Sequence, residues 1–309
     1  MNNDVSPNFF SLATYRDALQ RRRLQSGMVI RRSVGLDGTP PPRCDDPRES
    51  FCEVDGVARI VHRELPSMLV GGLGSLFFQM LHPLAMAGVA DHSRYQEDPL
   101  ARLLSTANFI SATTFGSRDT AHAAIDRVLN VHQFVHGTAD DGRPYDANDP
   151  HLLLWVHCAE VYMFLNAFRR FGSRRLSDVE ADRYVEELAP LAEALGVERA
   201  PRSVRELEAG LLSFRNELRL SADGEAARDF IAYGLMESRT QRLVYRLMVL
   251  GAWALLPRYA QERLGISRRP LLDRLLIQPA TSLLCAAMRL AMPRAVQVAS
   301  VIPPSTATT

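Results

Sequence analysis

The side chains most able to do chemistry are the histidines, because all eight lie between residues 62 and 157 of a 309-residue chain. A buried imidazole needs a partner such as a hydroxyl, a carbonyl, a metal ion or a haem iron. The common catalytic signatures are absent: there is no Gly-x-Ser-x-Gly, His-Glu-x-x-His or Gly-x-Gly-x-x-Gly, and no paired Glu-x-x-His. The histidines are therefore the first candidates for a functional site.

Two of them share a predicted helix over residues 118–137, where His132 and His136 continue an apolar stripe begun by Ile125 and Leu129. This spacing places one or both imidazoles on the inner face of the helix. It also permits zinc chelation, although no third ligand stands nearby. A core histidine bonded only to protein groups is the alternative.

A second predicted helix, over residues 150–171, carries His157 on an apolar stripe, and a core histidine bonded to a backbone carbonyl is again the alternative. A third, over residues 98–115, has Arg102 and Thr106 on one face. A guanidinium on a half-buried face needs an anion or a carbonyl, whereas an exposed arginine needs neither.

Composition excludes several mechanisms. The 36 basic residues are all arginine, so Schiff-base, phosphate-loop and kinase-type lysines are excluded. A net charge of +1 argues against a nucleic-acid binder. The four cysteines lack zinc-site spacing. They are expected to be free thiols in a reducing cytoplasm, and a bridge between Cys44 and Cys52 is the alternative.

The elements that position these residues are almost all helices, so we expect an all-α fold with a single helical domain over residues 55–295. An irregular N-terminal arm, residues 1–54, precedes it, and a disordered tail, residues 296–309, follows. The turn at residues 140–144 is expected to be a helix–helix loop, with a small hairpin as the alternative. The expected helices span 55–65, 68–81, 83–91, 98–115, 118–137, 150–171, 177–195, 203–219, 224–233, 238–257, 258–264 and 268–291.

The most apolar window, residues 66–90, is long enough to raise the question of a membrane span. Gln79, His82 and Pro83 interrupt it, which favours a buried helix pair, so no membrane span is expected. His82 ends the first of these helices, where an imidazole suits the helix dipole. The N-terminus has no basic segment followed by an apolar run, so no signal peptide is visible and a cytoplasmic location is expected.

Taken together, these segments resemble the haem-dependent oxygenase family that includes the fungal mycophenolic-acid pathway oxygenase and the bacterial latex-clearing proteins, the rubber oxygenases. The resemblance covers roughly residues 65–265. The matching text is Leu81-His-Pro-Leu-Ala-Met-Ala-Gly-Val-Ala-Asp-His-Ser93, Asp98-Pro-Leu-Ala-Arg102 with Thr106, Phe115-Gly116, Val131-His132 with Gly137, Gly142-Arg-Pro-Tyr145, Ala147-Asn-Asp-Pro150, Leu152-Leu-Leu-Trp-Val-His157 and, more weakly, Leu255-Leu-Pro257 through Leu264-Gly265.

The resemblance implies an all-α protein with a b-type haem between its helices. It gives the iron-ligand role to His132, with His136 and His157 as competitors, and places Arg102 and Thr106 near the distal face or the haem edge. His157 would otherwise belong to the pocket wall, and His82 is a further candidate contact of the cofactor. A neutral imidazole leaves the sixth iron position for dioxygen, and a hydroxyl or guanidinium can polarise bound oxygen or pair with a propionate.

The sequence departs from the rubber-cleaving branch immediately before Thr106, where Ser105 replaces a lysine. Rubber is therefore not expected as the substrate. The resulting hypothesis is a haem b-dependent oxygenase that uses dioxygen on an apolar small molecule, by oxidation or by C=C cleavage. The alternatives are a non-enzymatic haem- or lipid-binding helical protein, a redox-neutral enzyme in the same pocket, and a non-haem metal at the histidines.

Overall fold

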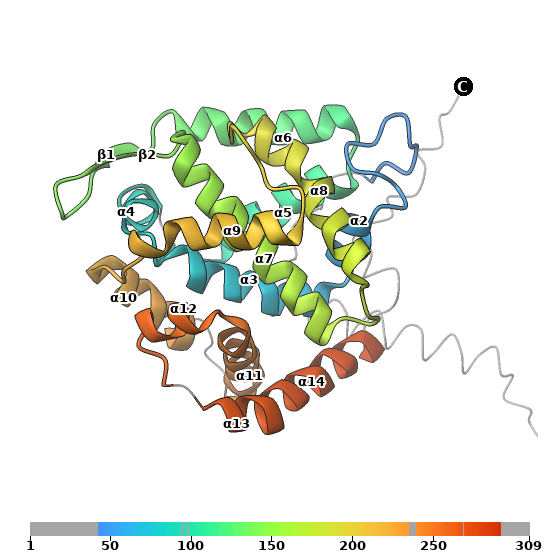
Figure 1. Cartoon of the computed structure of the whole chain (residues 1–309), viewed down its shortest axis with the longest axis vertical. Coiled ribbons are helices and arrows are strands. Elements are labelled where there is room, and N and C mark those ends of the chain that lie inside the picture. Colours follow the sequence, from blue (N-terminus) through green and yellow to red (C-terminus); the bar gives the residue numbers. More distant parts are fainter. Residues whose placement is uncertain (1–42, 94, 98, 235–238, 268, 292–309) are drawn as a thin grey trace, which may run out of the picture.

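The computed structural model describes residues 43–93, 95–97, 99–234, 239–267 and 269–291, and the predicted all-α class is confirmed (Figure 1). The arm up to residue 42 and the tail lie outside these residues. The helices are α2 Val57–His62, α3 Leu65–Gln79, α4 Pro83–His92, α5 Pro99–Phe115, α6 Arg118–His132, α7 Pro150–Phe171, α8 Asp178–Ala194, α9 Val204–Ser213, α10 Ala222–Asp229, α11 Arg239–Leu255, α12 Arg258–Arg263, α13 Pro270–Leu272 and α14 Gln278–Ala291.

The core is built around α3 and α7, which pack along each other through the middle of the molecule (Figure 1). Glycines allow the two backbones to approach closely. A Cβ on Gly71 would lie 3.1 Å from the Cα of Phe164, and a Cβ on Gly74 would meet the side chain of Met163. Phe164 and Met163 are buried on the facing side of α7. The small residues at the start of the apolar window therefore serve helix packing.

The expected buried pair over residues 66–90 is present as α3 and α4, which meet at an angle of 105°. His82 precedes α4 and Pro83 is its first residue, so the proline that cannot continue α3 begins the next helix. Both side chains are buried. Two other segments, Pro150–Phe171 and Pro270–Ala291, are each long and apolar enough to cross a membrane by length and composition alone.

Local capping signals fix several helix ends. Ser177 and Glu180 form the predicted capping box at the start of α8, each accepting a hydrogen bond from the other's backbone N–H. Asp149 caps α7, whose first residue is Pro150. Gly196, expected to end the next helix, has a φ of +108°, a left-handed conformation that suits glycine.

The helix expected over residues 118–137 is shorter than predicted, because α6 ends at His132. Strands β1 (His136–Thr138) and β2 (Pro144–Asp146) follow as an antiparallel hairpin with His136 opposite Asp146. Gly142 has a φ of +82° in the turn, and a Cβ on Gly137 would collide with the ring of Tyr145. The expected helix–helix loop is therefore wrong at this point, and the hairpin is correct.

The described end of the arm, residues 43–54, contains no helix and lies against α2 and α5. Arg59 on α2 is fully buried and holds it, donating hydrogen bonds to the backbone carbonyls of Cys44 and Thr114 and to the hydroxyl of Ser50. Cys44, Cys52 and the other two cysteines are free thiols. The bridge considered between the first two is therefore absent.

Candidate functional site

One face of helix α5 is exposed and polar near its start and reaches the interior farther along the helix. Arg102 and Thr106, near its start, are exposed, whereas Phe109 and Thr113 on the same face line an internal cavity. The hydroxyl of Thr113 donates to the carbonyl of Phe109 at 2.9 Å, so it is satisfied within its own helix. The two predicted residues therefore stand at the outer end of a face whose inner end borders the cavity.

The cavity has a volume of about 30 Å³ and lies among α2, α5, α7 and α8. His157 and Glu160 project into it from α7, where a spacing of three residues places both side chains on one face. Apolar side chains make up most of the rest of the wall. The lining residues are His62, Phe109, Ile110, Thr113, His157, Glu160, Val161, Phe164, Leu188 and Leu191.

Burial changes the protonation of the titratable groups around the cavity. It lowers the pKa of His157 to about 4 and that of His62 to about 3, and it raises the pKa of Glu160 to about 7. Both imidazoles are therefore neutral near pH 7, where Glu160 is divided between its acid and carboxylate forms. A cavity with this composition can hold polar groups poised for proton transfer.

The two cavity imidazoles differ in their hydrogen bonds. His62 is fully satisfied, with Nδ1 2.8 Å from the hydroxyl of Thr114 and Nε2 2.9 Å from the hydroxyl of Tyr184. In contrast, Nε2 of His157 is buried without a hydrogen-bond partner among the described residues. A buried nitrogen without a hydrogen bond costs folding free energy, so Nε2 of His157 is the cavity atom most in need of a ligand or a water molecule.

His132 is the last residue of α6 and is half-buried. It shares the inner face of that helix with Ile125, which is 3% exposed, as the stripe predicted. Nδ1 is buried and has no hydrogen-bond partner in the part of the chain that the structure describes. Burial lowers the pKa of His132, partly offset by Asp146, so the imidazole is neutral near pH 7.

Arg102 and Thr106, near the start of α5, each donate one hydrogen bond to a neighbouring oxygen atom. Nη1 of Arg102 donates to the hydroxyl of Ser93 at 2.8 Å, and the hydroxyl of Thr106 donates to the carbonyl of Arg102 at 3.2 Å. Desolvation lowers the pKa of Arg102, and no carboxylate of the described residues forms a salt bridge with it. The guanidinium is thus available to an external anion.

Two other predicted residues lie apart from the cavity. His136 is exposed on β1, so the helical spacing that put it beside His132 does not exist in the structure. His82 is fully buried, with Nε2 3.4 Å from a carboxylate oxygen of Glu217. The same carboxylate is bonded by His151, which makes this a separate polar cluster.

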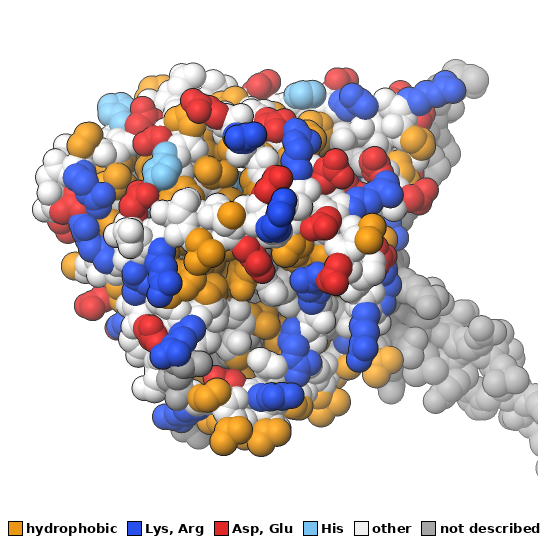
Figure 2. Space-filling model, in the orientation of Figure 1, with side chains coloured by type: hydrophobic (Ala, Val, Ile, Leu, Met, Phe, Trp, Pro, Cys, Tyr) orange, Lys and Arg blue, Asp and Glu red, His pale blue; other side chains and the backbone are white. Residues whose placement is uncertain are grey.

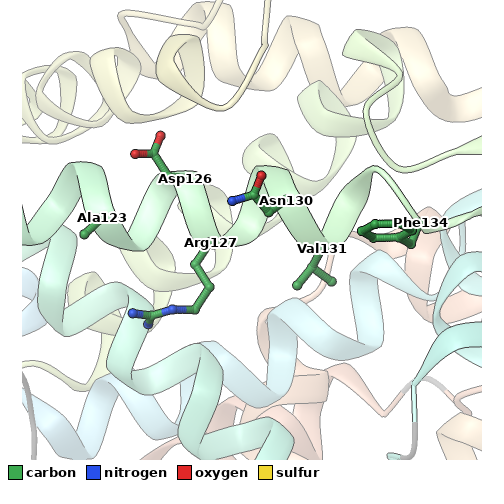
Figure 3. A pocket seen from close by; sticks show the side chains of 6 residues that line it. All are labelled: Ala123, Asp126, Arg127, Asn130, Val131 and Phe134. Carbon is green, nitrogen blue, oxygen red and sulfur yellow. The ribbon is translucent and has the colours of Figure 1, made fainter.

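No group of three or more histidine, cysteine, aspartate or glutamate residues that could hold a metal ion occurs in the described part of the chain. A surface depression of about 580 Å³, open to solvent, runs along the outer side of α6. Figure 3 shows that its labelled side chains come from consecutive turns of α6 and from Phe134 just after it, and that they do not converge. It holds Arg127 and Asp126 with the exposed Val131 and Phe134 but not His132, so it adds no candidate site.

Comparison with known proteins identifies a protein family. The family model described as "ER-bound oxygenase mpaB/B'/Rubber oxygenase, catalytic domain" matches residues 59–291. The chain belongs to this family. Neither a curated protein nor a solved structure matches the chain. The match confirms the family resemblance and supports an oxygenase enzyme.

The residues matched by the mpaB/rubber oxygenase family model include every residue that lines the cavity. Some residues in and around the cavity were not expected from the sequence. Glu160 was detectable, because it follows His157 by three residues on the same helix. His62 and Tyr184 were not, since α2 and α8 come together only in the folded chain, where His62 bridges Thr114 and Tyr184.

Two of the three candidate iron ligands, His132 and His157, are neutral, half-buried and have a ring nitrogen without a described hydrogen-bond partner. His157 faces a cavity of about 30 Å³, which is the space of about one or two water molecules and far too small for a porphyrin. His136 is exposed on the hairpin.

Proposed function

We propose that the chain is a haem b-dependent oxygenase that acts on an apolar small molecule. The observation that carries this proposal is the neutral imidazole of His132, with a buried nitrogen lacking a partner, in a chain that belongs to an oxygenase family. In this proposal the imidazole of His132 would hold the haem iron. A haem bound there supplies a redox-active iron that can take up dioxygen.

The residues of α5 would hold and orient the cofactor and substrate. Arg102, which forms no described salt bridge, would pair with a carboxylate such as a haem propionate. The hydroxyl of Thr106 now bonds a carbonyl of its own helix, and it can rotate to offer its proton elsewhere. We propose both as part of the site because they lie on the α5 face that leads to the cavity.

The apolar cavity wall suits an apolar group, but the cavity is too small for a substrate as it stands. Phe109, Ile110, Val161 and Phe164 line it together with two leucines of α8, and its volume of about 30 Å³ holds one or two water molecules. In this proposal these side chains would move apart to admit part of the substrate. Glu160 is the group that would accept or release a proton there, because its pKa of about 7 leaves both forms populated at neutral pH. His157 would hold a water molecule or a polar atom of the substrate.

The first experiment is an absorption spectrum of the full chain, purified after expression with adequate haem, in its oxidised and reduced states. A Soret band is expected, and its absence would overturn the cofactor assignment. His132→Ala is expected to reduce haem content by at least about tenfold. His122→Ala, an exposed histidine on the same helix, and His136→Ala should both retain it.

Loss of the band in His136→Ala or His157→Ala, with retention in His132→Ala, would move the ligand assignment to that residue. The second measurement is oxygen uptake with an apolar alkene. Uptake that depends on substrate is expected.

A redox-neutral reaction in the same cavity is the alternative, because Glu160 and His157 both line the cavity and could exchange protons with a bound molecule. Substrate consumption without oxygen uptake would support it. The cytoplasm remains our proposed compartment for either activity.

A further inference from the structure

The C-terminal segments expose more large apolar side chains than a soluble surface requires. We call these residues, which lie on α11 and on the continuous helical segment from α13 to α14, the C-terminal leucine surface. Its most exposed members are between 57% and 74% exposed. They are Leu243, Leu271, Leu275, Leu276, Leu283 and Leu290.

Helix α14 is apolar on both its faces. Its inner face is docked: Thr281 and Cys285 are fully buried, and a Cβ on Gly251 of α11 would lie 2.7 Å from the side chain of Thr281. Its outer face carries Leu283 and Leu290, which no described residue covers. Large apolar side chains grouped on an exposed face normally mark a binding surface, so the outer face of α14 lacks a partner.

The charge of the C-terminal segments indicates which kind of partner would cover the leucines. Residues 239–291 contain nine arginines and two acidic residues, a net charge of +7, although the whole chain has a net charge of +1. Arg269 and Arg274 are exposed beside the leucines. Figure 2 shows orange and blue side chains together at the lower edge, where Figure 1 places α11, α13 and α14. The arginines are Arg239, Arg242, Arg246, Arg258, Arg263, Arg268, Arg269, Arg274 and Arg289, and the acidic residues are Glu262 and Asp273.

We propose that the C-terminal leucine surface binds an anionic lipid membrane, with the leucines in the interface and the exposed Arg269 and Arg274 at the headgroups. Other arginines of the segment bind protein groups, as Arg289 does with Glu64 and Arg263 with the carbonyl of Leu218. Apolar side chains flanked by arginine are the pattern of interfacial helices. A second copy of the chain is a poorer partner, because pairing this surface with itself would bring two strongly positive segments together. The docked inner face of α14 keeps the helix parallel to the surface and not across the bilayer. Nothing in this proposal depends on the proposed chemistry.

The test is flotation of the full chain with vesicles of phosphatidylcholine alone and of phosphatidylcholine with phosphatidylglycerol. Wild-type protein is expected to float with the anionic vesicles and to be released by high salt. The triple variant Leu275→Gln/Leu283→Gln/Leu290→Gln should bind at least about tenfold more weakly. The matched control is Val179→Gln/Leu212→Gln, which changes two exposed apolar residues on α8 and α9 and should bind as the wild type does.

A second variant, Arg269→Gln/Arg274→Gln, is expected to weaken binding to anionic vesicles and to reduce its salt dependence. It keeps the proposal testable if the triple variant melts at a lower temperature than the wild type. Failure of the wild type to float with anionic vesicles would overturn the proposal, as would undiminished binding by both variants. A wild-type dimer that becomes monomeric in the triple variant, with no vesicle binding, would assign the surface to self-association instead.

Discussion

Two helical segments of this protein are equal in length and hydropathy but differ in how much of each is buried. Pro150–Phe171 and Pro270–Ala291 each have 22 residues and a mean hydropathy of 1.2 over their most apolar window, yet 56% of that window is buried in the first and 22% in the second. The first, α7, packs against α3, α8 and α9, whereas α14 packs against α11 with smaller contacts to α3 and α7. Hydropathy alone cannot separate a core helix from a surface one.

His157 and Glu160 of α7 and Arg274 of the C-terminal segment are placed in opposite ways, although Arg289 of that segment turns inward to Glu64. In α7, His157 and Glu160 point inward to the cavity, where burial keeps the imidazole neutral and raises the pKa of the carboxyl. In the C-terminal segment, Arg274 is outside with exposed leucines. Polar groups inside an apolar wall indicate chemistry, and apolar groups outside beside positive charge indicate a binding surface.

The largest expected difference between the two helices is in stability. Phe168 on α7 is 1% exposed, so Phe168→Ala should lower the free energy of unfolding by about 3–5 kcal/mol. Leu283 on α14 is 72% exposed, so Leu283→Ala should change it by less than about 0.5 kcal/mol. Denaturant unfolding measures both. Equal costs would mean that the outer face of α14 is covered in the folded protein.

A pH-dependent difference should follow from the carboxyl on α7. The folded-state pKa of Glu160 is about 7, above its ordinary value of 4.5. Between pH 4.5 and pH 7 the carboxyl therefore keeps its proton in the folded protein but loses it in the unfolded chain. Stability from this group is thus lost as the pH rises through that range, to a total of roughly 3 kcal/mol. Glu160→Gln, which cannot ionise, should melt at a higher temperature than the wild type at pH 8.

This advantage should shrink as the pH falls toward 4.5. Glu186→Gln, an exposed change on α8, is the matched control and should show no such trend. Thermal melting across the pH series measures both variants. An advantage that is the same at every pH would show that Glu160 does not titrate in this range in the folded protein.

The smallest expected effects concern the glycines at which each helix is docked. A Cβ on Gly71 would lie 3.1 Å from the backbone of Phe164 on α7, and one on Gly251 would lie 2.7 Å from Thr281 on α14. Gly71→Ala and Gly251→Ala should each cost about 1–3 kcal/mol. Gly72→Ala meets only an ordinary contact at 3.7 Å and should be neutral or stabilising by up to about 1 kcal/mol. An unaffected Gly251→Ala variant would mean that α14 is not docked as described.

Most of the fold was predictable from local signals. The capping box at Ser177, the Asp149–Pro150 start of α7 and the proline after His82 placed helix starts correctly, because caps act within a few residues. The end of α6 was not predictable from its stripe. The apolar spacing continues to His136, but the turn at Gly142 and the fit of Gly137 against a tyrosine ring favour a hairpin.

The candidate site was predictable only in part. Of the expected residues, His157 lines the cavity, whereas Arg102 and Thr106 are exposed near the start of α5 and their roles stay predictions. The expected link between His132 and His136 is wrong, because it assumed a helix that has already ended. His62 carried no sequence signal, since its partners Thr114 and Tyr184 are far away along the chain.

The sequence by itself determined the helical class, the helix starts, the absence of lysine chemistry and the family to which the chain belongs, because each depends on residue types and on spacings along the chain. The tertiary structure alone decided which of two equally apolar helices is buried and which titratable groups share one cavity. Burial and pKa depend on neighbours contributed by α2, α5, α7 and α8, and no local pattern states which helices will meet.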